Sequence, residues 1–386
     1  MPHNKIKNAF IEQIKLAFIL ISLCIALIFT DWLWTWDQTL YDIQVRASTS
    51  PAPNDVVIIA IDETSLNDFG RWPWQRSTHA ALIDRLNEMG AKIIVMDVIF
   101  SEETKNNKAA DRALADAIHR AKNVILPVLA EQTRLGSQLK ETLPLPMLIE
   151  AGAKLGHVHI ELDADGIARS VFLYEGLGKP RWPHISLAAL QQDNSQQIIS
   201  RATHGKNRSP FSWHRTQQKL IHFLGPPGQF KRISYRDVIR GAVKKESING
   251  KTVFVGVTAT GLGDALPTPV SGLTQPMSGV EINANIFASL RDNSNYQVMK
   301  NPWRLIISII IIMLPIIFLP RTSPRGALIL CTSLIFFSLS LSLTLIYYWH
   351  TWFAPLAVIL PLALCYPLWS WRRLEYTTQY LESQIK

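Results

Sequence analysis

The sequence predicts an α/β domain, built on a mostly parallel sheet with an antiparallel insertion, between one N-terminal and three C-terminal transmembrane helices. Two observations predict this fold class. Four long apolar runs, whose cores lack charged residues, flank a central stretch in which short apolar strands alternate with helices. The composition agrees, because only 18% of the 386 residues are charged and 48% are hydrophobic. These values exclude a disordered chain, and three cysteines are too few for a disulfide-stapled scaffold.

The first apolar run is expected to cross a membrane over residues 16–36, after a cytoplasmic N-terminus of residues 1–15. A cleaved signal peptide is the alternative, but no small-x-small cleavage pattern follows the run. Trp32 and Trp34 instead fit an interfacial belt, so we expect an uncleaved anchor. The three C-terminal spans are expected over residues 303–320, 327–349 and 353–371.

Basic residues at the ends of the spans set the expected orientation. Those expected in the cytoplasm are Lys5, Lys7, Lys15, Arg321, Arg325, Arg372 and Arg373. Lys300 and Arg304 lie on the opposite side of the second span and oppose this assignment. The majority predicts a multi-pass membrane protein with residues 37–302 outside the cell membrane, which in a Gram-negative cell is the periplasm. The net charge of +9 follows from these flanks, so we expect the lipid bilayer, and no nucleic acid, as a partner.

Within residues 37–302, strands and helices alternate as in a parallel sheet that is covered on both faces. Ser77 is placed to cap the first helix and Gly90 to end it. The expected elements are strand 56–61, helix 77–89, strand 91–100, helix 111–121, strand 123–130, a hairpin of 157–160 and 168–174, strand 220–224, strand 252–258 and helix 279–290. All three cysteines fall in spans, so the exported domain has no disulfide and no thiolate metal site.

Carboxylates follow several of these strands. Asp62 ends the first strand, Asp97 lies near the end of the second, and Asp264 follows strand 252–258. Because open α/β sheets bind ligands at the carboxyl ends of their strands, the three side chains are candidates for one site. The alternative is that they cap loops or pair with arginines.

The segment 70–76 (GRWPWQR) is unusually rich in Trp and Arg. It fits either a recognition surface or a rigid packed turn.

Three weaker motifs carry little chemistry. The glycine-rich run 256–264 lacks the Lys-Ser/Thr pair of a phosphate loop. The run 163–166 lacks the distal Glu of a calcium loop and fits a hairpin turn. His157 and His159 have metal-pair spacing without a third ligand nearby. We therefore assign no catalytic residue, metal or cofactor.

Several separated motifs, in the same order, resemble those of the CHASE2 extracellular sensory domain over about residues 35–300. They are Asp42 and Arg46; strand 56–61 with Asp62, Glu63, Thr64, Ser65 and Leu66; Gly70, Arg71, Trp72, Pro73 and Trp74 with Arg76 and His79; the run 94–100; Asp163, Asp165, Gly166 and Arg169; Gly256, Gly263 and Asp264; the run 276–281; and Ala284 with Asn285. The arrangement of one span before and three after this region is also that of the family.

The resemblance implies a bacterial receptor whose exported domain perceives a stimulus and whose cytoplasmic output domain acts on it. Residues 372–386 place Leu374, Thr378, Leu381 and Ile385 at near-heptad spacing, like the start of a signalling helix. This favours a histidine kinase output beyond Lys386, acting on a response regulator, in a homodimer. A nucleotide or diguanylate cyclase output is the alternative.

Two other functions stay open at this stage: a membrane-anchored periplasmic enzyme that uses Asp62, Asp97 and Asp264, and a stand-alone interaction protein. The uncharged span cores argue against a transporter. For an unknown extracytoplasmic ligand, the candidate binding residues are Asp62, Arg71, Trp72, Asp97, Arg169 and Asp264. Charges of both signs are among them, so charge alone does not choose the ligand.

Overall fold

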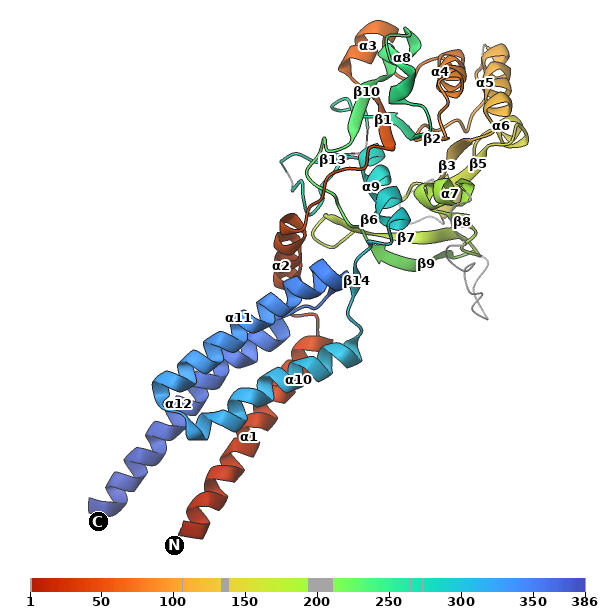
Figure 1. Ribbon diagram of the computed structural model, residues 1–386. Coiled ribbons are helices and arrows are strands. Elements are labelled where there is room, and N and C mark those ends of the chain that lie inside the picture. The colour runs from red at the N-terminus through yellow and green to blue at the C-terminus, as the bar shows by residue number, and fades with distance from the viewer. Residues whose placement is uncertain are drawn as a thin grey trace. The chain divides into compact units, whose positions relative to one another are not determined.

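The computed structural model describes residues 2–105, 107–132, 139–193, 211–263, 265–272 and 274–385 (Figure 1). The chain divides into two compact units. One comprises Val45–Asn295, and the other comprises Met1–Gln44 together with Tyr296–Lys386.

The unit Val45–Asn295 contains a seven-stranded sheet. Its order is β10 (Lys231–Ser234), β1 (Val56–Ile61), β11 (Thr252–Val257), β2 (Ile93–Met96), β3 (Val124–Gln132) and β4 (Leu139–Thr142), with β5 (Lys154–His157) also paired to β3. Every pairing is parallel except that of β3 with β4. The carboxyl ends of the parallel strands therefore lie along one edge, as the sequence predicts.

A smaller antiparallel sheet is inserted in the chain after β5. It consists of β6 (Glu161–Leu162), β7 (Ala168–Leu177), β8 (Trp182–Pro183) and β9 (Trp213–Leu220). A short antiparallel pair, β12 (Ala265–Leu266) and β13 (Met277–Ser278), follows β11. The predicted antiparallel insertion is thus confirmed.

Helices cover both faces of the large sheet, which explains why its central strands are apolar without interruption. In β1, Val57 and Ile59 pack with one core cluster and Val56 and Ile58 with the other. The first cluster contains residues of α4 (Arg76–Glu88), α5 (Lys108–Ala121), α6 (Pro146–Glu150) and α8 (Tyr235–Ile239). The second contains residues of α7 (Ile185–Gln192), α9 (Gly279–Arg291) and β7. Full burial of each such side chain contributes about 1.5–3 kcal/mol.

Several predicted boundaries need correction. The first long helix, α4, is capped by Gln75 and not by Ser77, because the chain enters the helix directly after the Trp-rich segment. Gly90 does follow its end, at a φ of 81° that favours glycine. Strand β2 stops at Met96, since the following residues leave the sheet.

The predicted hairpin is also shifted. His157 belongs to β5, parallel to β3, while β6 forms the antiparallel partner of β7. The strand expected at 220–224 lies earlier, as β9. Several short elements were not expected at all, among them the edge strand β10 and the short helices α3 (Glu63–Phe69) and α7.

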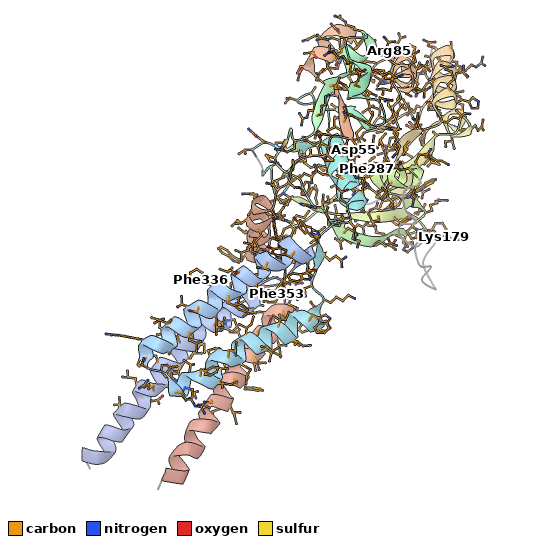
Figure 2. The ribbon with its side chains drawn as sticks, viewed as in Figure 1. Asp55, Arg85, Lys179, Phe287, Phe336 and Phe353 are labelled. Carbon is orange, nitrogen blue, oxygen red and sulfur yellow. The ribbon has the colours of Figure 1, made fainter. Side chains whose placement is uncertain are left out.

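The second unit is helical. It contains α1 (Pro2–Phe29), α2 (Trp34–Ala47), α10 (Asn301–Phe318), α11 (Pro324–Trp349) and α12 (Leu356–Ile385), with a short parallel pair of β14 (Gln297–Val298) and β15 (Thr351–Trp352). Phe353 is buried in its core, whereas Phe336 on α11 is exposed (Figure 2). Pro315 lies inside α10, and Pro361 and Pro367 lie inside α12.

Two described helices are long and apolar enough to cross a membrane, Asn301–Arg321 and Pro324–Trp349. A third crossing is possible if Gln13–Phe29 and Trp34–Ala47, which meet at 77°, form one broken span. The fourth predicted span, 353–371, falls mostly in α12 and is not among them, because the charged Arg372 and Arg373 continue that helix. The structure thus supports membrane helices, and the number four stays a prediction.

One of the two basic residues that opposed the predicted orientation, Arg304, has a partner within this unit. Arg304 lies 3.4 Å from Asp37 on α2, both largely buried, and the other Asp37 oxygen accepts from the Leu356 backbone N–H at 3.3 Å. Because its charge is paired with a carboxylate, Arg304 is weaker evidence against the predicted orientation than an unpaired basic residue would be.

Candidate functional site

A cavity of about 880 Å³ opens at the carboxyl ends of β11, β2, β3 and β5, beside the first turn of α9. Its size suits a small organic ligand. The walls combine a segment before α4, the chain after β2 and β5, the end of β3, and the loop after β11. The cavity thus lies where open α/β sheets bind their ligands.

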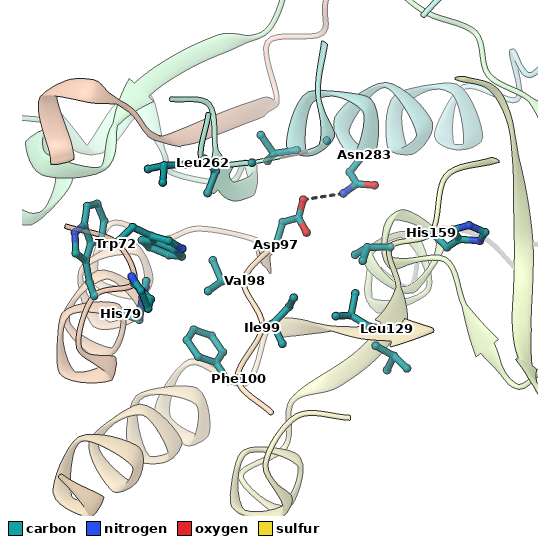
Figure 3. Close-up of a pocket in the computed structure, with 18 of the residues that line it drawn as sticks. Trp72, His79, Asp97, Val98, Ile99, Phe100, Leu129, His159, Leu262 and Asn283 are labelled. Atoms are coloured by element: carbon teal, nitrogen blue, oxygen red, sulfur yellow. Dashed lines mark hydrogen bonds between the residues drawn. The ribbon is translucent and has the colours of Figure 1, made fainter. Parts of the chain in front are cut away.

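Asp97 and Asn283 form one polar patch of the cavity wall (Figure 3). Asp97 directly follows β2, and its backbone N–H still donates to the Val255 carbonyl at 2.7 Å, which holds the residue at the strand end. The Asn283 side-chain N–H donates to the Asp97 carboxylate at 3.1 Å. Asn283 is only 1% exposed, and its Oδ1 atom has no hydrogen-bond partner among the described residues. A buried oxygen without a donor is costly, so it marks a position for a ligand or water.

Gly256 allows α9 to begin this close to the sheet. A Cβ atom on Gly256 would lie 2.7 Å from Cβ of Val280 and 3.2 Å from Cβ of Asp97. Any larger residue in β11 would therefore push the first turn of α9 away from Asp97. This is the structural reason for glycine at that place in the motif.

Aromatic rings form the opposite wall. Trp72 packs edge-on against Trp74 and His79, at ring distances of 5.2 and 5.6 Å, and His79 lies 5.2 Å from Phe100. The Trp74 indole donates to the Gly70 carbonyl at 2.9 Å, and the Trp72–Pro73 peptide bond is cis. The Trp-rich segment is thus both a packed turn and a wall of the cavity.

His79 is neutral in this wall. Burial, with a smaller contribution from the nearby Arg76 charge, lowers its pKa to about 4. The Nδ1 atom of His79 lies 3.0 Å from the hydroxyl of Tyr235. Burial raises the pKa of this hydroxyl well above its usual value.

Arg76 also lines the cavity, but its guanidinium is held by other groups. It donates to the carboxylate of Asp111, to the hydroxyl of Thr104 at 3.2 Å and to the carbonyl of Glu102. Burial alone would raise the pKa of Asp111, but the hydrogen bonds from Arg76 and Thr104 outweigh it and hold that pKa below its usual range. Arg76 therefore joins the loop after β2 to α5.

Asp62 lies outside this wall and caps a helix. Its Oδ1 accepts from the Ser65 backbone N–H at 2.9 Å and from the hydroxyls of Ser65, Thr64 and Ser234 at 2.6, 2.9 and 3.0 Å. Burial favours a higher pKa, but these hydrogen bonds outweigh it and lower the pKa of Asp62. A carboxylate with this many donors holds α3 and β10 in place.

Arg169 is likewise engaged within the antiparallel sheet. It is 1% exposed and donates to Asp163 at 2.8 Å and to both oxygens of Asp165 at 2.8 and 2.9 Å. These contacts close the turn between β6 and β7, where the Gly166 N–H donates to the Asp163 carbonyl. The run 163–166 is a hairpin turn, as expected, and its two carboxylates face an arginine.

Of the six predicted ligand residues, the structure brings Trp72 and Asp97 to the same cavity. Asp62 and Arg169 hold local structure elsewhere, and Arg71 is exposed beyond the cavity lining. Asp264 lies outside the described residues. Sequence reasoning missed Asn283 and Arg76 as wall residues. The available signal for Asn283 was an asparagine between the apolar residues Ile282 and Ala284 of α9.

The two histidines with metal-pair spacing do not converge. The buried His157 ring packs on His184, with centroids 5.1 Å apart, whereas His159 lies 3.2 Å from Glu175. Burial lowers the pKa of both His157 and His184, the latter to about 3. Among the described residues, no group of three or more His, Cys, Asp or Glu side chains is placed to hold a metal ion.

Comparison with known proteins identifies the family. The family model for the CHASE2 domain matches residues 18–318, about three quarters of the chain. No curated protein and no solved structure matches the chain. The matched range includes both strands and loops that form the cavity, and the apolar helices on either side. The chain belongs to the CHASE2 family, the sensory domain of bacterial transmembrane receptors.

Proposed function

We propose that this chain is the sensory and membrane portion of a receptor that perceives an extracytoplasmic stimulus at the cavity and transmits it to a cytoplasmic histidine kinase. The cavity carries the proposal: it is a ligand-sized space at the carboxyl edge of the sheet, lined by family motif residues including Trp72 and Asp97. Binding there would bias the packing of the helices that leave the domain toward the membrane.

The proposed setting is the bacterial inner membrane, with four spans and the domain in the periplasm, in a homodimer. Basic flanks and four apolar runs support it. Maleimide labelling of two exposed positions tests it. Asp292→Cys should react in intact cells, whereas Arg325→Cys, in the first turn of α11, should react only after the inner membrane is permeabilised. The three native cysteines are buried and none lies in Val45–Asn295. The reverse labelling pattern would overturn the orientation.

To test signalling, the catalytic core of a soluble, active sensor kinase is fused to the end of α12 so that the helix continues without a break. Phosphorylation of the response regulator of that kinase is the readout. Ile99 lines the cavity and is 52% exposed, so Ile99→Trp fills the space with little strain on the core. Leu143→Trp is the matched control, because Leu143 is 37% exposed and outside the cavity lining. We expect Ile99→Trp alone to change the output. Equal output from both variants would overturn the cavity as the sensory site.

The competing enzyme hypothesis receives less support. It needs Asp62 and Asp97 to act together, but Asp62 is a helix cap with four donors and does not line the cavity.

A further inference from the structure

We propose that the cavity binds an amphipathic amine: a small apolar body carrying a protonated amino group, which is held between Asp97 and Asn283. This inference rests on the proposed sensory function and names the class of molecule that the site would sense.

The polar patch formed by Asp97 and Asn283 presents acceptors. Asp97 contributes a carboxylate. The side-chain amide nitrogen of Asn283 donates a hydrogen bond to this carboxylate at 3.1 Å. The Asn283 oxygen is left buried without a donor among the described groups. Two neighbouring acceptors, one of them anionic, are complementary to a group with several N–H donors and a positive charge.

The basic side chains of the described wall are paired with carboxylates or neutral. Arg76 is paired with Asp111, His79 is neutral, and His159 is paired with Glu175. An anionic ligand would therefore meet the Asp97 carboxylate without gaining a cation from the wall.

The first turn of α9 contains a carboxylate of its own, that of Glu281. The N-terminal N–H groups of the helix would by themselves attract an anion. However, the fully buried Glu281 lies in that turn, where it accepts from the Gly228 N–H at 2.7 Å and pairs with Arg232. The N-terminus of α9 therefore has a carboxylate nearby without an anionic ligand.

The rest of the cavity suits an apolar body. Trp72, Trp74 and Phe100 supply aromatic surface, and aliphatic side chains supply further apolar surface. Figure 3 shows Val98 and Leu262 near these aromatic side chains. At its rim, Ile99, Leu162 and Leu262 are 52, 46 and 40% exposed. Exposed aliphatic side chains gathered around a cavity mark a surface that binds apolar groups.

Calorimetric titration of the full chain in nanodiscs tests the class, with three probes of the same shape: 2-phenylethylamine, 2-phenylethanol and phenylacetate. Asp97→Asn keeps the shape of the side chain and a hydrogen-bond acceptor but removes the charge. Asp116→Asn is the control, because Asp116 is an exposed carboxylate on α5 outside the cavity. Any binding of the probes to lipid or to distant carboxylates would be the same in both variants.

We expect the amine to bind at least about tenfold more tightly than the alcohol, and phenylacetate not to bind. Asp97→Asn should weaken amine binding about tenfold and leave alcohol binding unchanged, while Asp116→Asn behaves as the parent chain. No amine binding, or equal amine binding by the two variants, would overturn the proposal. Tighter binding of the alcohol or of phenylacetate would overturn the amine class as well.

These outcomes are separate from the test of the sensory function. If the amine class fails but Ile99→Trp still changes kinase output, the cavity remains the sensory site with another ligand. If the amine binds as expected but Ile99→Trp has no effect on output, the binding site stands and the proposed function fails.

Discussion

Replacement of Arg169 by methionine distinguishes a structural arginine from a ligand-binding one. Methionine has a similar length and fills the same space without charge or donors. The side chain is 1% exposed and makes three hydrogen bonds of 2.8–2.9 Å to Asp163 and Asp165. Its loss leaves two carboxylates at the turn between β6 and β7 without their cation.

The expected cost follows from how buried the three partners are. Removal of one member of a fully buried ion pair costs about 3–5 kcal/mol. Here the carboxylates remain 20 and 26% exposed, so water can rehydrate them in the variant. We therefore expect a loss of about 2–4 kcal/mol in local stability, and about half of that for Arg169→Lys, which keeps the charge but not the planar fork.

The effect should depend on pH in a defined direction. Burial favours a higher pKa for Asp165, but the hydrogen bonds and charge of Arg169 outweigh it and lower that pKa. A carboxyl group with a lowered pKa in the folded state stabilises the fold above its unfolded pKa of about 3.9, and this contribution is lost as the pH falls through the folded pKa. The difference between parent chain and Arg169→Met should thus be constant near neutrality and shrink below about pH 4.

Hydrogen exchange on the amides of β7 and β9 in the full chain measures the opening free energy of this sheet. Exchange in α4 and α5, which pack on the other face of the large sheet, serves as the internal reference. Unchanged exchange in β7 and β9 of Arg169→Met, together with lost ligand binding, would refute the structural assignment and return Arg169 to the binding site.

Three further predictions concern the cavity and its supports. Gly256→Ala should lower stability by about 1–3 kcal/mol, seen as a lower melting temperature, because the added Cβ would lie 2.7 Å from Val280. Acidification from pH 6.5 toward 4 should cost up to about 3 kcal/mol at His79, whose pKa is lowered to about 4, since the unfolded chain takes up the proton first. His79→Gln should remove that part of the decline in melting curves recorded against pH. Asp111→Asn should lower the melting temperature through a loss of about 2–4 kcal/mol, because Arg76 is left 12% exposed without its carboxylate; an unchanged value would show that this pair contributes nothing.

The elements that could be predicted from the sequence are those buried on both faces. Strand β1 is apolar over its whole length and β11 is apolar after Thr252, so their residues indicate burial whichever way they point. Helix α9 is marked by its many apolar residues, although polar residues such as Glu281 lie among them. The edge strand β10 could not be found in this way. Its four residues, Lys231–Ser234, pair with β1 on one side only and are exposed or half-buried, so no apolar run marks them.

The wall of the cavity was only partly predictable, because its members come from distant parts of the chain. Asp97 and Trp72 were predicted from position and composition. Asn283 was not, because its importance depends on Gly256, which lets α9 approach the sheet closely enough for the amide to reach Asp97. That approach is a property of two packed elements and is absent from either local sequence.

The different fates of Asp62 and Asp97 show what decides whether a carboxylate after a strand belongs to a site. Both follow parallel strands of the same sheet. Helix α3 begins immediately after Asp62, so the free N–H groups of its first turn and the nearby hydroxyls take up the carboxylate. After Asp97 the chain continues without a helix along the cavity, and the carboxylate accepts a hydrogen bond from the Asn283 side chain of α9. The discriminating signal is therefore the sequence after the aspartate. Asp62 is followed by Glu, Thr and Ser, residues typical of a helix start, whereas Asp97 is followed by Val, Ile and Phe, which favour an extended chain.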